Sequence, residues 1–310
     1  MPADLYYHAA ANSPKRLYVS GGLSIQDITP GGASLNVNTK VFSAPFRAEG
    51  ELGEWTESGV LPEPLNQHGM AVVAGRLFIA GGRRKSAFTD AVRSAPLRAD
   101  GSLGPWRKEA SLPLPRGAHA LVAHGDTLWV VGGSVRADYF TEGTRGLWRA
   151  KLSSDGEARV SRWETLEAPQ ALHYEQNVAV ANGRLYAAQA QGGLFSLALD
   201  GGTPWRGEMT PPWMHDVDFG RSGLHLVRLV ALPGMLLALV PHGLTFTADL
   251  EADGTVKNWR LASRLYNTDS GFATAVEPGG RVYVLGGTNS RQPVRRNAEV
   301  WSTTRLVPQP

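Results

Sequence analysis

Short apolar stretches, each closed by a turn signal, follow one another along the whole chain. The stretch RLFIAGG at 76–82 returns as RLYVSGG at 16–22, TLWVVGG at 127–133 and RVYVLGG at 281–287. Short apolar runs that end in glycine are typical of strands followed by tight turns. No convincing helical periodicity is found, so the pattern predicts an all-β protein.

The apolar stretches belong to one repeat. The first apolar residue of each stretch recurs about every 50 residues, which is typical of a repeat architecture, at Leu17, Leu77, Leu128, Leu185, Leu236 and Val282. Each copy reads as strand, glycine turn, strand, loop, strand, Asp-Gly turn and a segment headed by tryptophan. This order predicts a four-stranded antiparallel meander.

A sheet with two apolar faces needs a neighbour on each side, and sheets arranged radially around an axis provide one. The sequence therefore predicts one domain, 1–310: a six-bladed β-propeller of four-stranded antiparallel blades. The blades are expected at approximately 4–62, 63–114, 115–168, 169–214, 215–265 and 266–306. The tryptophans that head the fourth segments are expected to wedge between blades: Trp55, Trp106, Trp163, Trp205 and Trp259.

The last copy departs from this plan. Its third strand, AEVWSTTRL at 298–306, is followed only by VPQP, and three residues precede the first inner strand of the chain. The sixth blade is therefore expected to have three strands. Its outer edge would be left open, protected by proline, or paired with another chain, which makes self-association or assembly through this edge an alternative.

The chain resembles the kelch family of β-propellers. The residues that carry the likeness are the glycine pairs at 21/22, 81/82, 132/133 and 286/287, the downstream tryptophans, and the histidines that open three inner strands, His8, His68 and His119. The resemblance spans essentially the whole chain and implies the fold. It implies little about activity, because such propellers include binding modules, scaffolds and a minority of enzymes.

Composition narrows the classes of function. The chain has 36 Gly, 20 Pro and 42% hydrophobic residues, which favours many turns around a real core. A net charge of +3 is only mildly basic, and the absence of cysteine excludes disulfides and thiolate metal sites. No apolar run is long enough to span a membrane, and no signal peptide is seen, so a cytoplasmic location is the default expectation.

One connection is longer than the others. An insertion within TPPWMHDVDFGRSGLHL, at 210–226, joins the predicted fourth and fifth blades, which also lack the glycine pair. It should lie above their short loops, as part of a cup with the start of the fourth inner strand. The side chains expected to line this cup are His215, Asp216, Asp218, Arg221, His225, His173, Tyr174 and Glu175.

Three interpretations of the cup stay open. Residues two apart in an extended chain point the same way, which pairs Asp216 with Asp218 and His173 with Glu175. Such groups stabilise a loop, bind a ligand, or act as catalytic acid and base, with His173, Glu175, His215, Asp218 and Arg221 as the catalytic candidates. Their spacing matches no metal motif, so neither a metal nor a cofactor is predicted.

Basic residues gather in the loops between second and third strands. They are expected to form a crescent on one face that suits carboxylate, sulfate or phosphate groups, and they comprise Arg83, Arg84, Lys85, Arg136, Arg145, Arg291, Arg295 and Arg296. Solubilising charge is the alternative interpretation. These loops lack interleaved aromatic residues, which argues against a nucleic-acid surface.

These observations leave three functions. The first is a non-catalytic binding or scaffold propeller that contacts a protein, glycan or other acidic partner through its loop face. The second is a structural subunit of a larger assembly. The third is an isomerase- or lyase-type propeller enzyme with a pocket over the fourth and fifth blades. The sequence favours binding, because it shows no phosphate loop, nucleophile elbow or zinc signature.

Overall fold

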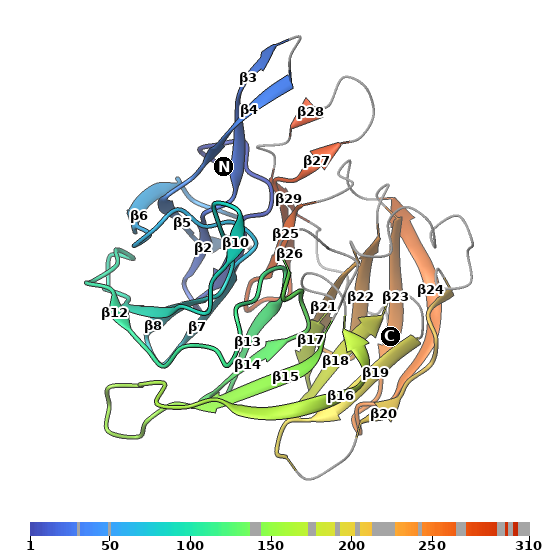
Figure 1. Ribbon diagram of the computed structural model, residues 1–310. Coiled ribbons are helices and arrows are strands. Elements are labelled where there is room, and N and C mark those ends of the chain that lie inside the picture. The colour runs from blue at the N-terminus through green and yellow to red at the C-terminus, as the bar shows by residue number, and fades with distance from the viewer. Residues whose placement is uncertain are drawn as a thin grey trace.

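The computed structural model shows an all-β propeller with four-stranded antiparallel blades (Figure 1). It describes residues 1–29, 32–48, 51–136, 144–172, 178–189, 193–201, 205–212, 227–240, 244–264, 271–289, 295–296 and 300–302. In this part of the chain five sheets have four strands, one fewer than the six blades predicted, and a sixth sheet has three strands.

The strands follow the repeat in chain order. Blade one contains β1 (Ala9–Asn12), β2 (Arg16–Ser20), β5 (Lys40–Pro45) and β6 (Thr56–Val60). Blade two contains β7 (Gly69–Val73), β8 (Arg76–Ala80), β11 (Val92–Pro96) and β12 (Arg107–Lys108). Blade three contains β13 (Ala120–His124), β14 (Thr127–Val131), β15 (Thr144–Lys151) and β16 (Glu164–Leu172). Blade four contains β17 (Val178–Ala181), β18 (Arg184–Gln189), β19 (Gly193–Ala198) and β20 (Arg206–Gly207). Blade five contains β21 (Arg228–Leu232), β22 (Met235–Val240), β23 (Leu244–Leu250) and β24 (Val256–Arg264).

The remaining strands form one three-stranded sheet and three hairpins. The three-stranded sheet joins β25 (Ala273–Val276), β26 (Val282–Leu285) and β29 (Val300–Ser302). The hairpins are β3 (Leu23–Thr29) with β4 (Gly32–Val37), β9 (Arg83–Arg84) with β10 (Ala87–Phe88), and β27 (Thr288–Asn289) with β28 (Arg295–Arg296). Each hairpin lies in the connection between the second and third strands of its repeat.

The inner strands form a closed series around the centre. Strand β7 contacts β1 and β13, β17 contacts β13 and β21, and β25 contacts both β21 and β1. Hydrophobic clusters fill the spaces between successive sheets. The six anchor residues of the repeat are each 0% exposed, namely Leu17, Leu77, Leu128, Leu185, Leu236 and Val282. Their burial shows why the same apolar stretch is repeated, because every sheet needs it against a neighbour.

The glycine pairs sit where one sheet meets the next. At Gly81, with φ of +57°, a Cβ would meet the carbonyl of Arg116 and lie 2.8 Å from Cε1 of His119, both in the following repeat. The next residue, Gly82, has φ of +100° and donates its N–H to the Arg116 carbonyl at 2.7 Å. Positive φ and close approach together require glycine here.

The same contact links the three-stranded sheet to blade one. A Cβ at Gly286 would meet the carbonyl of Leu5 and lie 2.8 Å from Cε1 of His8. The N–H of Gly287 donates to the Leu5 carbonyl at 2.9 Å. Residues near the two ends of the chain thus meet through the interaction that joins blades one and two, where Gly22 donates to Leu65 at 2.9 Å.

The tryptophans also join neighbouring blades, as the sequence predicted. The indole N–H of Trp106, in blade two, donates to the carbonyl of Val60, in the outer strand of blade one, at 2.7 Å. Trp163, Trp205 and Trp259 donate to carbonyls of the preceding blade in the same way, at 3.0–3.1 Å. A hydrogen bond therefore repeats along the outer rim of the ring.

Candidate binding face and central channel

The three hairpins define one face of the molecule, here named the loop face. Figure 1 shows β3–β4 and β27–β28 extending together beyond the blades at the top of the view. Bridges join the base of the loops to the segments that lead into the inner strands, at Tyr6 with Leu23, Asn66 with Arg83, and Gly117 with Ser134. These bridges fix the loops to the rigid part of the ring.

Apolar side chains are exposed on the loop face. Leu35 of β4 is 52% exposed, Leu114 in the connection between blades two and three is 54% exposed, and Val135 after β14 is 40% exposed. Leu114 belongs to this face because its neighbours on both sides bond to the loop of blade two: Leu112 donates to Asp90, and Arg116 to Thr89. Single exposed apolar residues are common on protein surfaces, so these three indicate a binding surface mainly because they lie in loops, where binding residues concentrate.

The basic residues of the loop face are only partly available. Arg84 forms a salt bridge with Glu63 at 2.9 Å, and the Nε of Arg83 donates to the carbonyl of Lys85 at 3.2 Å. Strand β28 places Arg295 and Arg296 in a hairpin equivalent to β9–β10. The salt bridge within the protein reduces the positive potential expected for the predicted crescent of basic residues.

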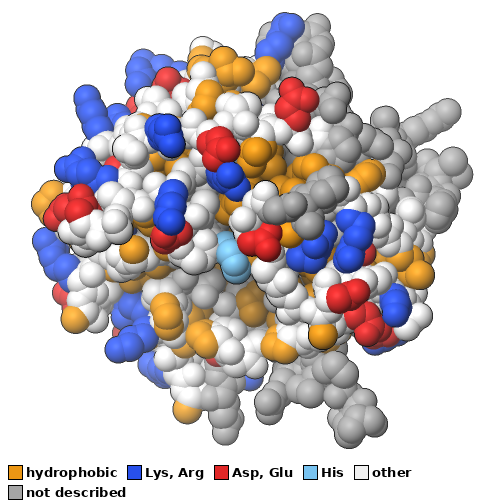
Figure 2. All heavy atoms as spheres, turned by 90° about the horizontal axis from the view of Figure 1, so that it is seen from below, with side chains coloured by type: hydrophobic (Ala, Val, Ile, Leu, Met, Phe, Trp, Pro, Cys, Tyr) orange, Lys and Arg blue, Asp and Glu red, His pale blue; other side chains and the backbone are white. Residues whose placement is uncertain are grey.

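The opposite side has a different surface. Figure 2 views the molecule from below, away from the β3–β4 hairpin, and shows basic and acidic side chains interspersed with small groups of hydrophobic ones. Mixed charge of this kind suits solvent. The exposed apolar groups of the loop face therefore make that face the better candidate for binding.

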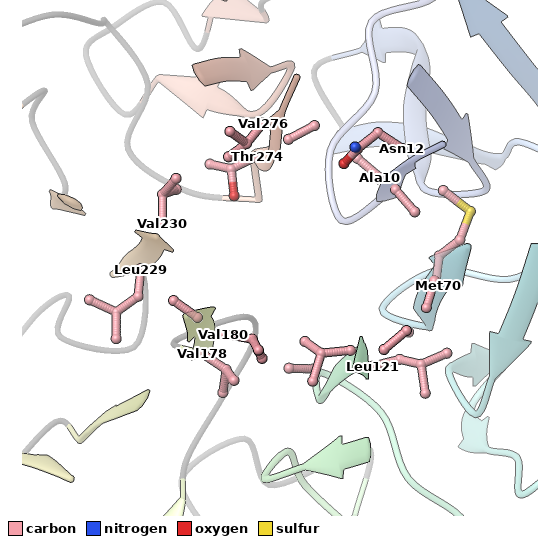
Figure 3. Close-up of a pocket in the computed structure, with 18 of the residues that line it drawn as sticks. Ala10, Asn12, Met70, Leu121, Val178, Val180, Leu229, Val230, Thr274 and Val276 are labelled. Carbon is pink, nitrogen blue, oxygen red and sulfur yellow. The ribbon is translucent and has the colours of Figure 1, made fainter. Parts of the chain in front are cut away.

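A channel runs between the inner strands. It has a volume of about 350 Å³, and Figure 3 shows side chains of the inner strands directed into it. The side chains that line it are mostly apolar, as at Met70, Leu121 and Leu229, with Asn12 and Thr274 as polar exceptions. Because polar atoms nevertheless make up the larger part of the lining surface, the cavity is not an apolar one. A volume of this order is within the range of small-molecule sites.

Three histidines lie beside this channel around a small polar chamber. The chamber has a volume of about 10 Å³ and is lined by Tyr7, His8, Gln67, His68, Ala118, His119 and Arg228. His68 is within 2.8 Å of the Ser20 hydroxyl through Nε2. The carbonyls of Leu5 and Ala80 lie near His8 and His119 but fall short of hydrogen-bond geometry with the ring nitrogens. Among these three histidines, only His68 forms a side-chain hydrogen bond with a described residue.

Burial keeps these histidines neutral. It lowers the pKa of His8 to about 3, assisted by the nearby charges of His68 and Arg228. Burial also lowers the pKa of His68 to about 4. For His119 the pKa falls to about 3, mainly through burial and then through Arg116 and His68. At neutral pH the imidazoles serve as uncharged polar groups.

Two buried arginines were not recognised from the sequence. Arg228 extends from blade five into the polar chamber and donates to the Phe272 carbonyl at 3.1 and 3.2 Å. Arg116 stacks over Trp148, 3.6 Å from the ring centroid, and donates to the carbonyls of Gly132 and Gly146 at 2.8 Å. The only signal for Arg228 is a charged residue in the apolar run LVRLVAL.

The residues of the predicted cup lie outside the described part of the chain, namely His173, Tyr174, Glu175, His215, Asp216, Asp218, Arg221 and His225. Arg291 of the predicted basic crescent also lies outside it. Within the described part of the chain, no group of three or more His, Asp or Glu residues is arranged to hold a metal ion. In that same part, no helix is long and apolar enough to cross a membrane.

Comparisons with known proteins give two partial matches. The chain is 30% identical to alpha-scruin of Limulus polyphemus over 134 residues, which make up 43% of this chain and 14% of alpha-scruin. It is also 30% identical to beta-scruin of the same organism over 127 residues, or 41% of this chain and 13% of beta-scruin. The match thus spans about one seventh of each relative. No protein-family model matches the chain.

Proposed function

We propose that the chain is a kelch-type propeller of six blades, with β25, β26 and β29 as the sixth. The support is the repeat of one contact: Gly287 donates to Leu5 as Gly22 donates to Leu65. Strand β25 also contacts both β21 and β1, as an inner strand of a ring should. The glycine pairs and the tryptophan spacing support the kelch resemblance.

The function we propose is non-catalytic: a binding or scaffold propeller that contacts a protein partner through the loop face. The observation that carries this proposal is the exposure of Leu35, Leu114 and Val135 on loops fixed to a rigid ring. Because Arg84 is paired with Glu63, we favour apolar contact with a protein over recognition of an anionic glycan. The partial similarity to two large proteins, the scruins, agrees with a modular role of this kind.

The test compares apolar patches on two faces. Leu35→Asp with Val135→Asp places two carboxylates on the loop face, whereas Leu261→Asp changes a residue 59% exposed on the outer strand β24. Proteins retained from the native source by the wild type should be lost with the loop-face variant and kept with Leu261→Asp. Equal retention by all three proteins would refute the proposal.

A further inference from the structure

In blades two, three and five, the turn before the outer strand provides two hydrogen-bond donors to the preceding blade. The first is the tryptophan indole described above. The second is the backbone N–H three residues earlier: Leu103 donates to the Ser58 carbonyl at 2.8 Å, and Val160 donates to Oε2 of Glu109 at 3.0 Å. Val256 donates to Oε2 of Glu208 at 3.2 Å. All these acceptors belong to the outer strand of the preceding blade or to the residues directly after it.

Blade one has the same two donors in the same local structure. Leu52 bridges Phe46 as Leu103 bridges Leu97, and Gly53 donates to Pro45 as Gly104 donates to Pro96, both at 2.8 Å. The preceding sheet is β25–β26–β29, and in the described residues it has no fourth strand. Within that same part of the chain, neither the Leu52 N–H nor the Trp55 indole N–H has an acceptor.

The three-stranded sheet also has a serine at the position that, in two other blades, contacts the outer segment. In blades two and four, a serine on the third strand donates to the glutamate that directly follows the outer strand, Ser94 to Glu109 at 2.6 Å and Ser196 to Glu208 at 2.5 Å. Ser94 lies opposite Phe78, and Ser302 of β29 lies opposite Tyr283, the equivalent residue of the repeat. Ser302 thus has the register position from which a serine meets that glutamate.

Beside this edge, apolar residues of blade one already pack against the three-stranded sheet. Phe46, Leu52 and Trp55 pack against the cluster that contains Tyr283 and Leu285, and the rings of Phe46 and Tyr283 stack with centroids 5.8 Å apart. Only the strand that would cover this edge is lacking among the described residues.

We propose that the outer edge of β29 is a docking site for an extended segment of a partner polypeptide. The segment pairs with β29 as the fourth strand of the sheet. One of its backbone carbonyls accepts a hydrogen bond from the Trp55 indole N–H, and a glutamate carboxylate accepts one from the Leu52 N–H. Glutamate is the expected side chain because Glu109 and Glu208, its equivalents in blades two and four, have side chains only 0% and 2% exposed and each receives several donors. The inference rests on the proposed assignment of β25, β26 and β29 as the sixth blade.

The test uses a peptide that copies the outer segment of blade two, RKEASLP at 107–113. Added to the full ¹⁵N-labelled chain, it should shift the NMR signals of the Trp55 indole and the Leu52 amide and slow exchange of that amide at least tenfold. The peptide RKQASLP should bind roughly tenfold more weakly, because it lacks the charged acceptor. Trp55→Phe should weaken binding about fivefold, the effect of one neutral hydrogen bond.

Two control variants separate this site from other effects. Trp163→Phe makes the same change in blade three and should leave peptide binding unchanged. Leu35→Asp with Val135→Asp should also leave it unchanged, so failure of the loop-face proposal is distinguishable from failure of this one. The inference is overturned if the Leu52 amide already exchanges slowly in the chain alone, if millimolar RKEASLP shifts neither signal, or if RKQASLP binds equally well.

Discussion

The glycine pairs show how a single residue decides the spacing between blades. Replacing Gly81 with alanine puts a methyl group against the Arg116 carbonyl and within 2.8 Å of the His119 ring, at a φ of +57°. We expect Gly81→Ala to lower the free energy of unfolding by roughly 3 kcal/mol or more, from strained backbone and steric overlap together. Chemical denaturation followed by tryptophan fluorescence measures the change.

The control for this substitution is a glycine that has the same backbone conformation but no neighbouring atoms close to an added Cβ. Gly125 also has a φ of +57°, but no atom lies within 4 Å of an added Cβ. Gly125→Ala should therefore cost only about 1 kcal/mol, the backbone contribution alone. Equal losses at the two positions would mean that close packing between blades does not explain the glycine pairs.

At the scale of the strand, the repeated indole bond should stabilise each blade against the previous one. Trp106→Phe keeps an aromatic ring and removes the 2.7 Å bond to the Val60 carbonyl. We expect a loss of about 1 kcal/mol in the free energy of unfolding, the usual net value of one hydrogen bond.

Trp55→Phe should change stability by no more than a few tenths of a kcal/mol, because no acceptor faces the Trp55 indole among the described residues. Denaturation of the two variants under identical conditions tests the difference. A loss at Trp55 as large as that at Trp106 would contradict an open outer edge in the isolated chain.

The strand pattern was predictable from the sequence because it depends on local spacing. The anchors, the turns and the tryptophans all recur at short fixed distances, and the structure places the anchors in the core. The polar chamber was not predictable, because Arg228 and His68 meet only through the arrangement of several blades around the axis. In the sequence Arg228 is merely a polar residue in a strand, and the residues of the predicted cup lie outside the described part of the chain.

At the scale of the whole molecule, three buried neutral histidines in three blades make the free energy of unfolding depend on pH. Their folded pKa values, about 3 for His8 and His119 and about 4 for His68, lie below the unfolded value of 6.5. The unfolded chain therefore binds more protons below pH 6.5. Burying these histidines in the neutral form therefore costs no stability above pH 6.5. As the pH falls from 6.5 toward 4, the free energy of unfolding decreases.

The expected decrease in the free energy of unfolding is large enough to measure between pH 7.5 and 5.5, a range in which few carboxylates titrate. One pKa unit corresponds to about 1.4 kcal/mol for each group, so the three histidines should together cost about 4 kcal/mol between pH 7.5 and 5.5. Substitution by glutamine, the residue at the equivalent position 176, should remove about one third of this loss for each histidine changed. Urea denaturation at several pH values gives the slopes. A wild-type stability that stays constant from pH 7.5 to 5.5 would show that the three imidazoles take up protons without unfolding of the propeller.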